Sequence, residues 1–209
     1  KQDSRAGGED LMVLGSHLFC LMRLFAGDAQ WCTARVLQDG RDITAADARE
    51  VKERIGPVAG DEITAQFGFD GGVGGTFTSR GRLRNVLGHW GLVLVGTKQS
   101  ARVLADITPR VLVTRPAGPS DLGRGDDWRS FDPALSGADS APGAGEAAAN
   151  RRVVDDWLDA IRRDREPACS ARAATKSLEM IMAVYHAALA GARVPLPLKD
   201  RGHPLQPKP

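Results

Sequence analysis

Two residues near the start of the sequence, His17 and Asp10, have side chains that could act on a hydroxyl group. They stand within a run of apolar residues that recur three and four positions apart, which is the pattern of an amphipathic helix. At about 100° per residue, both fall near one edge of the apolar stripe, roughly 10 Å apart along the helix axis. A small ligand could bridge that distance. The imidazole would polarise or deprotonate a hydroxyl, while the carboxylate would hold a second hydroxyl or an arginine.

His17 also has a plain structural interpretation, as a histidine at the edge of the core whose ring is satisfied by a backbone carbonyl. The other histidines, His89, His186 and His203, stand beside a predicted strand, in a predicted helix and in the tail. We expect each of these three to be structural or solvated. The interleaved Arg and Asp residues between positions 151 and 165 predict a solvated helix face with local ion pairs and no ligand.

Four glycines between positions 71 and 75 raise the question of a phosphate-binding loop. A dinucleotide fingerprint needs a glycine turn that leads from a strand into the N-terminus of a helix. Here the glycines lie between two alternating segments, residues 63–69 and 73–79, and no helix pattern follows them. They therefore predict the turn of a β-hairpin.

The composition is that of a folded domain. The chain has 209 residues, of which 42% are hydrophobic and 26% charged, enough for one substantial core. A formal net charge of +2 gives no surplus for a phosphate backbone and argues against nucleic acid as a partner. No apolar run approaches the roughly 18 to 20 residues of a membrane span. Cys20, Cys32 and Cys169 are too scattered for a disulfide framework or a metal site, so we expect reduced thiols.

Hydrophobic periodicity and capping residues predict four helices. Counted with the residues that cap them, these are 9–27, 45–54, 150–167 and 170–191. Period-2 alternation and β-branched residues predict six strands. These are residues 31–37, 63–69, 73–79, 90–96, 102–107 and 111–115.

Short connections between the strands favour antiparallel or mixed pairing. We therefore expect an α+β fold, with an open mixed, largely antiparallel β-sheet of five or six strands covered on one face by helices. The whole chain, residues 1–209, is predicted to be one domain. Residues 116–149, crowded with Gly, Pro, Ala and Asp, are predicted to be a long surface loop. The proline-rich tail, residues 194–209, is expected to run extended across the surface.

The opening segments, residues 7–17 (GGEDLMVLGSH) and 21–27 (LMRLFAG), resemble the helix that begins the C-terminal domain of Gfo/Idh/MocA oxidoreductases. This is the family of glucose–fructose oxidoreductase and inositol dehydrogenase. Further segments agree in order and spacing, so that the resemblance spans nearly the whole chain. They are residues 60–65, 90–91, 96–98, 156–158, 166–167 and 194–198.

The resemblance implies a two-domain enzyme, in which an N-terminal Rossmann domain binds NAD or NADP and this C-terminal half shapes the substrate pocket. It places His17 beside the substrate carbon that loses its hydride, as the catalytic residue. Asp10 and Arg5 are then candidates for binding the substrate. The family usually has aspartates one turn before and one turn after that histidine, where this chain has Val13 and Cys20.

The function implied is oxidation or reduction of a sugar or polyol hydroxyl by hydride transfer, with this half inactive alone. One alternative is NAD-dependent glycoside cleavage within the same family. Another is a non-catalytic assembly or sugar-binding module. The resemblance also implies a homo-oligomer that pairs through the sheet face. Because the chain opens without a methionine or a signal peptide, we expect a piece of a longer protein and take the cytoplasm as the default compartment, with the periplasm or secretion as alternatives.

Overall fold

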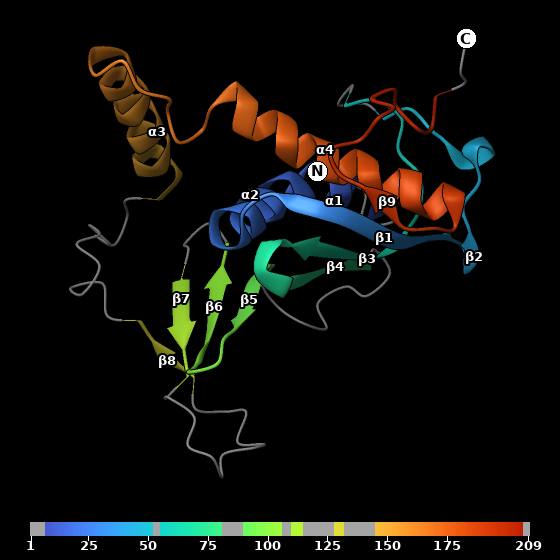
Figure 1. Ribbon diagram of the computed structural model, residues 1–209, viewed down its shortest axis with the longest axis horizontal. Helices are drawn as coiled ribbons and strands as arrows, with labels where there is room; N and C mark the ends of the chain where they lie inside the picture. The colour runs from blue at the N-terminus through green and yellow to red at the C-terminus, as the bar shows by residue number, and fades with distance from the viewer. Residues whose placement is uncertain are drawn as a thin grey trace. The chain divides into compact units, whose positions relative to one another are not determined.

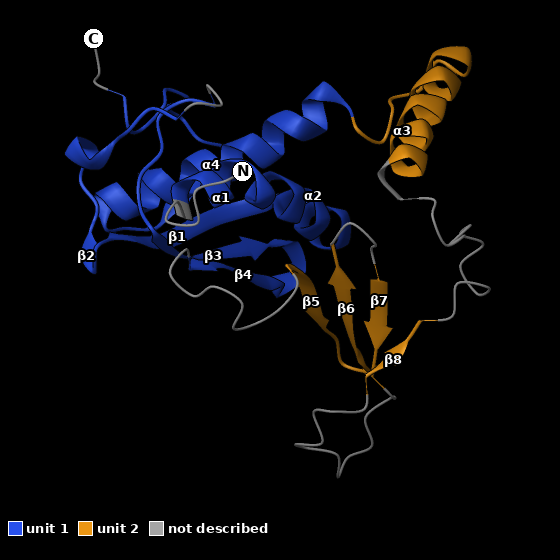
Figure 2. Ribbon diagram, turned by 180° about the vertical axis from the view of Figure 1, so that it is seen from behind, with its two compact units in different colours: residues 1–86, 170–209 blue, residues 87–169 orange. Residues whose placement is uncertain are grey.

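A computed structural model of the chain describes residues 7–51, 55–80, 90–105, 110–114, 128–131 and 145–206. The chain divides into two compact units (Figure 2). The first unit comprises residues 1–86 together with residues 170–209, and the second comprises residues 87–169. The chain therefore leaves the first unit after its initial helices and strands, builds the second, and returns with its last helix.

The first unit begins with two helices, α1 (Gly7–Met12) and α2 (Leu14–Ala26) (Figure 1). The prediction of one helix up to residue 26 is therefore wrong at Val13, where the two helices meet. The hydroxyl of Ser16 donates a 2.6 Å hydrogen bond to the carbonyl of Val13. Such a side-chain bond to a carbonyl three residues earlier competes with the helical ladder. The C-terminal end is as predicted, because Gly27 has φ 79° and its N–H bonds the carbonyl of Arg23.

The sheet of the first unit consists of β1 (Ala29–Gln38), β2 (Arg41–Asp42), β3 (Glu62–Phe69), β4 (Gly74–Arg80) and β9 (Val194–Pro195). Its order is β2-β1-β3-β4, with β9 added to β1, and every pairing is antiparallel. The predicted hairpin is confirmed. Residues 70–72 join β3 to β4, and Gly71 and Gly72 have φ values of 67° and 78°, which glycine adopts without strain.

The predicted polar helix at 45–54 is largely wrong. Only Ala45–Asp47 forms a short 3₁₀ helix, η1, and residues 52–54 lie outside the described part of the chain. Thr44 and Asp47 satisfy each other's backbone N–H groups across this turn in a capping box. Beyond η1, Arg49 forms an antiparallel bridge with Val58, so extended pairing replaces the helix.

Helices α1, α2 and α4 (Ala171–Ala190) cover one face of this sheet (Figure 1). Inward-pointing residues of neighbouring strands form the core, and Phe19 of α2 packs on them. Its ring lies 5.2 Å from that of Phe67 and 5.0 Å from that of Phe77, between ring centroids. As predicted, α4 begins after Ser170, whose hydroxyl accepts the N–H of Ala173, and ends at the left-handed Gly191.

The tail returns to the first unit. Val194 and Pro195 pair with β1, and the side chains of Leu196, Leu198 and Leu205 are buried. Three buried leucines contribute on the order of 1.5–3 kcal/mol each relative to exposed ones. The described part of the tail, residues 194–206, contains no helix.

The second unit contains β5 (Gly91–Val95), β6 (Ser100–Leu104), β7 (Arg110–Val113), β8 (Arg129–Ser130) and α3 (Gly145–Arg162). The strands form an antiparallel meander in chain order. Helix α3 begins at Gly145, five residues before the predicted start at Asn150. Most of the predicted surface loop, residues 116–149, lies outside the described residues. Within it, β8 and the first turn of α3 are described.

An α+β fold with antiparallel strands and helices on one sheet face is thus confirmed. The expectation of a single sheet is wrong for the described residues, whose strands form one five-stranded and one four-stranded sheet. Short turns join β1 to β2, β3 to β4 and β5 to β6, so these pairings have a local sequence signal. The pairings of β1 with β3 and with β9 join residues far apart in the chain and have no such signal.

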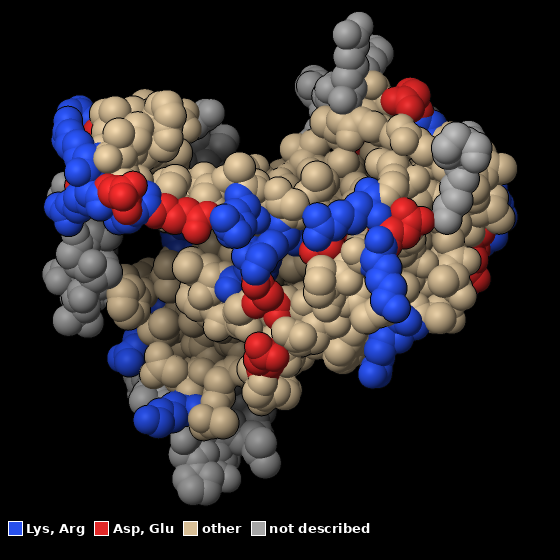
Figure 3. Space-filling view, turned by 45° about the horizontal axis from the view of Figure 1, so that its top comes forward, with Lys and Arg blue, Asp and Glu red and all other residues tan. Residues whose placement is uncertain are grey.

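The surface mixes charges of both signs. Figure 3 shows Lys and Arg side chains beside Asp and Glu side chains across the face drawn. Exposed ion pairs, such as Arg35–Asp42, also join charges of opposite sign. Among the described residues, every helix is too short or too polar to cross a membrane. In the same residues, no three His, Cys, Asp or Glu side chains come together in a way that could hold a metal ion. The three cysteines are free thiols, and burial raises the pKa of Cys32 to about 12.

Candidate functional site

Helix α1 is anchored by Gly8, which approaches the chain just before β3. The N–H of Gly8 bonds the carbonyl of Gly60 at 3.0 Å, and a side chain at Gly8 would collide with the carbonyl of Ala59. Only glycine permits this approach of backbone to backbone. Because Gly8 sets the position of α1, it also sets the positions of the two acidic residues that follow it, Glu9 and Asp10.

Asp10 is half-buried between α1 and β4. The hydroxyl of Ser79 on β4 donates a 3.3 Å hydrogen bond to its carboxylate. Burial raises the pKa of Asp10, the hydrogen bond from Ser79 lowers it, and the charge of Glu9 raises it further, with a net increase. Asp10 is therefore a partly desolvated carboxylate that can accept a hydrogen bond from a ligand hydroxyl.

Glu9 serves a different purpose. Its side chain is 10% exposed and forms an ion pair with Arg49 at 2.9 Å. This pair connects α1 to the bridge between Arg49 and Val58. A nearly buried carboxylate needs such a partner. Glu9 is thus committed to holding α1 in place, whereas Asp10 remains the acidic residue available for a ligand.

His17 lies in the first turns of α2, and its side chain is exposed. This exposed position leaves the imidazole within reach of a ligand from the solvent. α1 and α2 are separate helices that meet at Val13. The relative positions of His17 and Asp10 therefore depend on this join and not on the 100° spacing of one continuous helix. Arg5, the third predicted site residue, lies outside the described residues.

The two positions at which the family pattern has carboxylates are used in another way here. Val13 forms the join between α1 and α2. The sulfur of Cys20 lies 3.2 Å from the hydroxyl of Ser177, so that it connects α2 to α4. Neither side chain can accept a proton from His17 as a carboxylate would. Any proton that His17 takes up must therefore leave by another route.

Sequence reasoning missed Ser79 as a partner of Asp10. The signal was present, because Ser79 continues the inward-pointing positions of β4 after Gly75 and Phe77. A polar residue in an apolar series at period 2 indicates a hydrogen-bond partner on the covering helix. What the pattern does not indicate is which residue of that helix the hydroxyl contacts.

The glycines of the β3–β4 turn do not form a nucleotide site. They form a hairpin, and β4 follows them where a dinucleotide fingerprint would need a helix. The described residues therefore do not fit the pyrophosphate of a dinucleotide at this turn.

Comparison with known proteins identifies the relatives of this chain. A family model described as "Oxidoreductase family, C-terminal alpha/beta domain" matches residues 1–196. The chain belongs to the Gfo/Idh/MocA oxidoreductase family. The match covers nearly all of the chain, which confirms the resemblance seen in its opening helix. None of the curated proteins compared with this Gfo/Idh/MocA chain matches it.

Several solved structures of oxidoreductases share the fold of this Gfo/Idh/MocA chain. An NAD-binding oxidoreductase from Klebsiella pneumoniae has a TM-score of 0.63 at 16% identity, covering 89% of this chain and 50% of that one. A levoglucosan dehydrogenase in complex with NADH and levoglucosan has a TM-score of 0.64 at 18% identity, covering 89% and 50%. An oxidoreductase domain protein from Kribbella flavida has a TM-score of 0.63 at 20% identity, covering 89% and 49%. This chain thus spans about half the length of the structures it resembles.

Proposed function

We propose that this chain is the substrate-binding half of an NAD(P)-dependent oxidoreductase that acts on a sugar or polyol hydroxyl. The observation that carries the proposal is the exposed imidazole of His17 on α2, in a chain that belongs to an oxidoreductase family. In the resemblance described above, this is the position of the histidine beside the reacting carbon. An exposed imidazole on a fixed helix can meet a substrate, whereas an enclosed one cannot.

The chain's own residues would bind the substrate and move its proton. His17 would accept the proton of the hydroxyl under oxidation, so that the O–H bond breaks as a C=O bond forms. Asp10, held by Ser79, would accept a hydrogen bond from a neighbouring hydroxyl. Arg5 remains the other candidate for binding the substrate. A nicotinamide bound by the complete enzyme would supply the hydride acceptor, so that both electrons leave with the hydride and the oxidation balances.

The dinucleotide would be bound mainly by residues outside this chain, which has no nucleotide fingerprint of its own. Two observations support this division. The solved structures with the same fold are about twice as long as this chain, and several are complexes with NAD or NADH. We accordingly expect the isolated 209-residue chain to be inactive and the complete enzyme to be active. NAD is the first cofactor to test.

The site and the neighbours both support a sugar or polyol as the substrate class that we propose. The Asp10 carboxylate accepts the hydrogen bond of Ser79 and still has lone pairs for a second donor. A hydroxyl next to the reacting one in a polyol is such a donor. Among the structural neighbours are complexes of levoglucosan dehydrogenase with levoglucosan and with L-sorbose. Levoglucosan, L-sorbose and myo-inositol therefore form a first panel of substrates.

The deciding experiment replaces His17 by Asn in the complete enzyme and follows reduced nicotinamide by absorbance. Loss of the base should reduce kcat by about 10²–10⁴-fold. Leu24→Ala is a matched control, because Leu24 lies on the same helix and its side chain is 74% exposed. A His17→Asn enzyme with unchanged kcat would overturn the assignment.

A second candidate function is a non-catalytic module, which the contact of Cys20 with Ser177 favours. A residue that packs on α4 at a position where the family has a carboxylate is what a chain without proton transfer would show. Such a module would bind a sugar or assemble without turning it over. Binding and turnover of the panel separate the two functions. A non-catalytic module should bind a panel sugar with the same affinity in the wild type and in the His17→Asn variant, and neither protein should reduce NAD.

We also propose that the chain pairs with a second copy through the uncovered face of the β1–β3–β4 sheet. This face presents short polar side chains, among them Thr64 and Thr78, which are directly opposite each other. Short, exposed polar side chains of this kind allow the face to pack against a copy of itself about a two-fold axis. The expected result is a dimer or larger oligomer in analytical ultracentrifugation of the wild type and a smaller species for Thr64→Arg. A wild type that sediments as a monomer would contradict the pairing.

A further inference from the structure

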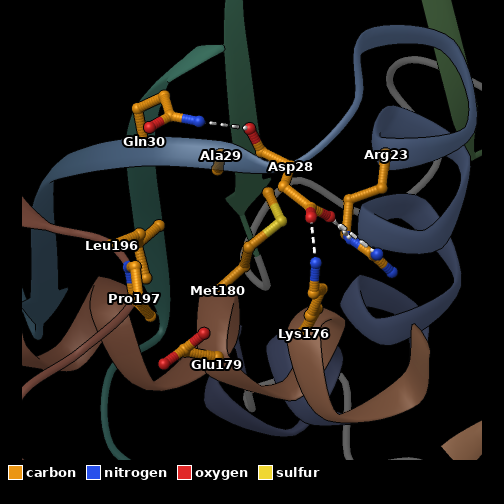
Figure 4. Close-up of a pocket in the computed structure, with 9 residues that line it drawn as sticks. All are labelled: Arg23, Asp28, Ala29, Gln30, Lys176, Glu179, Met180, Leu196 and Pro197. Atoms are coloured by element: carbon orange, nitrogen blue, oxygen red, sulfur yellow. Dashed lines mark hydrogen bonds and ion pairs between the residues drawn. The ribbon is translucent and has the colours of Figure 1, made fainter. Parts of the chain in front are cut away.

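A cavity of about 200 Å³ lies in the first unit (Figure 4), and its lining includes neither His17 nor Asp10. It is formed where the end of α2, the start of β1, the middle of α4 and the tail meet. Its walls combine an apolar floor with four charged side chains. The floor consists of Ala29, Met180, Leu196 and Pro197, and the polar residues are Arg23, Asp28, Gln30, Lys176 and Glu179.

Arg23 and Asp28 are fully engaged with each other and with the protein. Arg23 donates to one carboxylate oxygen of Asp28 at 2.8 Å and to the carbonyl of Ala173 at 2.7 Å. Lys176 bonds the other oxygen of Asp28. Mainly through this bond to Lys176, the pKa of Asp28 is lowered. The two residues therefore form a rigid wall and leave Lys176 in a fixed position.

Lys176 and Glu179 keep capacity for a ligand. An ammonium group has three N–H donors, and Asp28 accepts one of them. The side chain of Glu179 is 15% exposed, and its Oε1 atom accepts the N–H of Leu198 at 2.8 Å, with the guanidinium of Arg201 4.0 Å from the same oxygen. Among the described residues, none donates a hydrogen bond to the other oxygen of Glu179. Glu179 lines the cavity with little exposed surface, so a donor group of a ligand can replace water at its second oxygen.

The two charges have opposite signs and share one face of α4. Residues three positions apart on a helix are neighbours, so Lys176 and Glu179 stand side by side at the cavity. They do not pair with each other, because Lys176 is held by Asp28 and Glu179 by the backbone of Leu198. Figure 4 shows both residues on α4, with Lys176 directed toward Asp28 and Glu179 near Pro197. This arrangement is complementary to a small molecule that carries both charges.

We propose that this cavity binds a free α-amino acid with a small apolar side chain. The carboxylate of the ligand contacts the ammonium of Lys176. Its ammonium group donates to the unused oxygen of Glu179 and to the side-chain oxygen of Gln30. The apolar side chain lies on Met180 and Leu196. A cavity of about 200 Å³ holds one such molecule and little more.

A ligand of a single charge fits less well. A simple anion would contact Lys176 but would also lie beside the carboxylate of Glu179, and two neighbouring negative charges repel each other. A simple cation would meet Glu179 but would lie beside Lys176. A dipolar ligand can pair its negative group with Lys176 and its positive group with Glu179. This site does not depend on the redox reaction proposed above.

The test measures binding of L-valine to the protein by isothermal titration calorimetry and by chemical shifts of the Met180 methyl group. Two analogues of valine each remove one charge. Isobutylamine lacks the carboxylate, and isovalerate lacks the amine. We expect saturable binding of L-valine and affinities at least about tenfold weaker for both analogues, since each loses a charge-assisted hydrogen bond. Absence of saturable valine binding up to about 10 mM, or equal binding of either analogue, overturns the proposal.

Variants then assign the contacts. Glu179→Gln retains an acceptor for the Leu198 N–H and should weaken valine binding at least about tenfold while leaving the fold intact. Lys176→Met should weaken it similarly. Lys199→Met and Glu62→Gln are matched controls that leave the cavity unchanged, and thermal unfolding verifies that each variant is folded. Valine binding that persists in both Glu179→Gln and Lys176→Met overturns the assignment. His17→Asn should leave valine binding unchanged, so the two proposals fail independently.

Discussion

The hydroxyl of Ser79 on β4 donates a hydrogen bond to the carboxylate of Asp10 on α1, with 3.3 Å between the two oxygens. The bond joins residues 69 positions apart and connects the first helix to an edge strand of the sheet that it covers. Within the described part of the chain, Asp10 is left partly desolvated without an opposite charge of its own, since Arg49 pairs with Glu9. A carboxylate in this state is poorly placed for stability and well placed for binding a hydroxyl.

Replacing Asp10 by Asn should therefore stabilise the protein at neutral pH. The folded pKa of Asp10 is raised, mainly by burial, so its ionised form costs stability at pH values above that pKa. Asparagine removes the charge and keeps an acceptor for Ser79. We expect a higher Tm for Asp10→Asn at about pH 7, a difference that shrinks as the pH falls through the raised folded pKa of Asp10 and is smallest below its usual value of 3.8.

Asp28 provides a control of opposite sign for this prediction. Its pKa is lowered by the hydrogen bond from Lys176 and by Arg23, so its ionised form adds stability at neutral pH. Asp28→Asn should lower the Tm at about pH 7, and the difference should shrink in acid. Equal shifts of the same sign for Asp10→Asn and Asp28→Asn would contradict both assignments.

Acid should weaken the attachment of the tail through His203. The Nδ1 atom of His203 accepts the N–H of Leu205, and its Nε2 atom is buried with no hydrogen-bond partner among the described residues. Burial lowers the pKa of His203 below its usual 6.5, Glu50 opposes this, and His186 adds to it. The neutral form of His203 therefore contributes its full stabilisation above about pH 6.5. This contribution is lost as the pH drops from 6.5 toward the lower pKa of the folded state.

Urea unfolding at about pH 7.5 and pH 5 measures this dependence on pH. The change between the two should be smaller in His203→Gln, which cannot titrate. Glu50→Gln should lower the pKa of His203 further and enlarge the loss in acid. A wild-type stability that rises on acidification through this range would refute the role of His203.

The hydroxyl of Tyr185 stabilises the junction of α4 with the chain before β3. Tyr185 is fully buried. Its hydroxyl donates to the carbonyl of Ala59 and accepts the N–H of Ala59, both at 3.3 Å. Tyr185→Phe leaves these buried backbone groups without that partner, at a cost of about 1–3 kcal/mol. Tm should fall by roughly 2–4 °C for each kcal/mol. Phe25→Leu, on a side chain that is 53% exposed, should change the free energy of unfolding by less than about 0.5 kcal/mol.

Phe19 should be the most sensitive position of α2. Its side chain has no exposed surface and packs against two phenylalanine rings of the sheet. Phe19→Ala should lower the free energy of unfolding by about 3–5 kcal/mol, measured in urea with the m-value compared between variants. Leu24→Ala on the same helix should cost less than about 0.5 kcal/mol. A similar loss in both variants would show that α2 is not packed on the sheet as described.

Several elements could be predicted from the sequence because their signals are local. Ser170 and Gly191 mark both ends of α4, and the glycines at 71 and 72 mark the β3–β4 turn, since caps and positive φ values depend on a few neighbouring residues. The exposed position of His17 and the role of Ser79 were less accessible. Periodicity indicates that a residue lies on a helix or faces a sheet, but not what lies opposite.

What the sequence alone determined is the type and order of most elements, the antiparallel hairpin, the capped final helix and membership of an oxidoreductase family. The tertiary structure decided the join at Val13, the division of the strands into two sheets, the contact of Asp10 with Ser79 and the cavity beside Lys176 and Glu179. The physical reason is distance along the chain. Caps and alternation act between residues a few positions apart, whereas Ser79 meets Asp10 and Lys176 meets Asp28 only after the core of the first unit has packed.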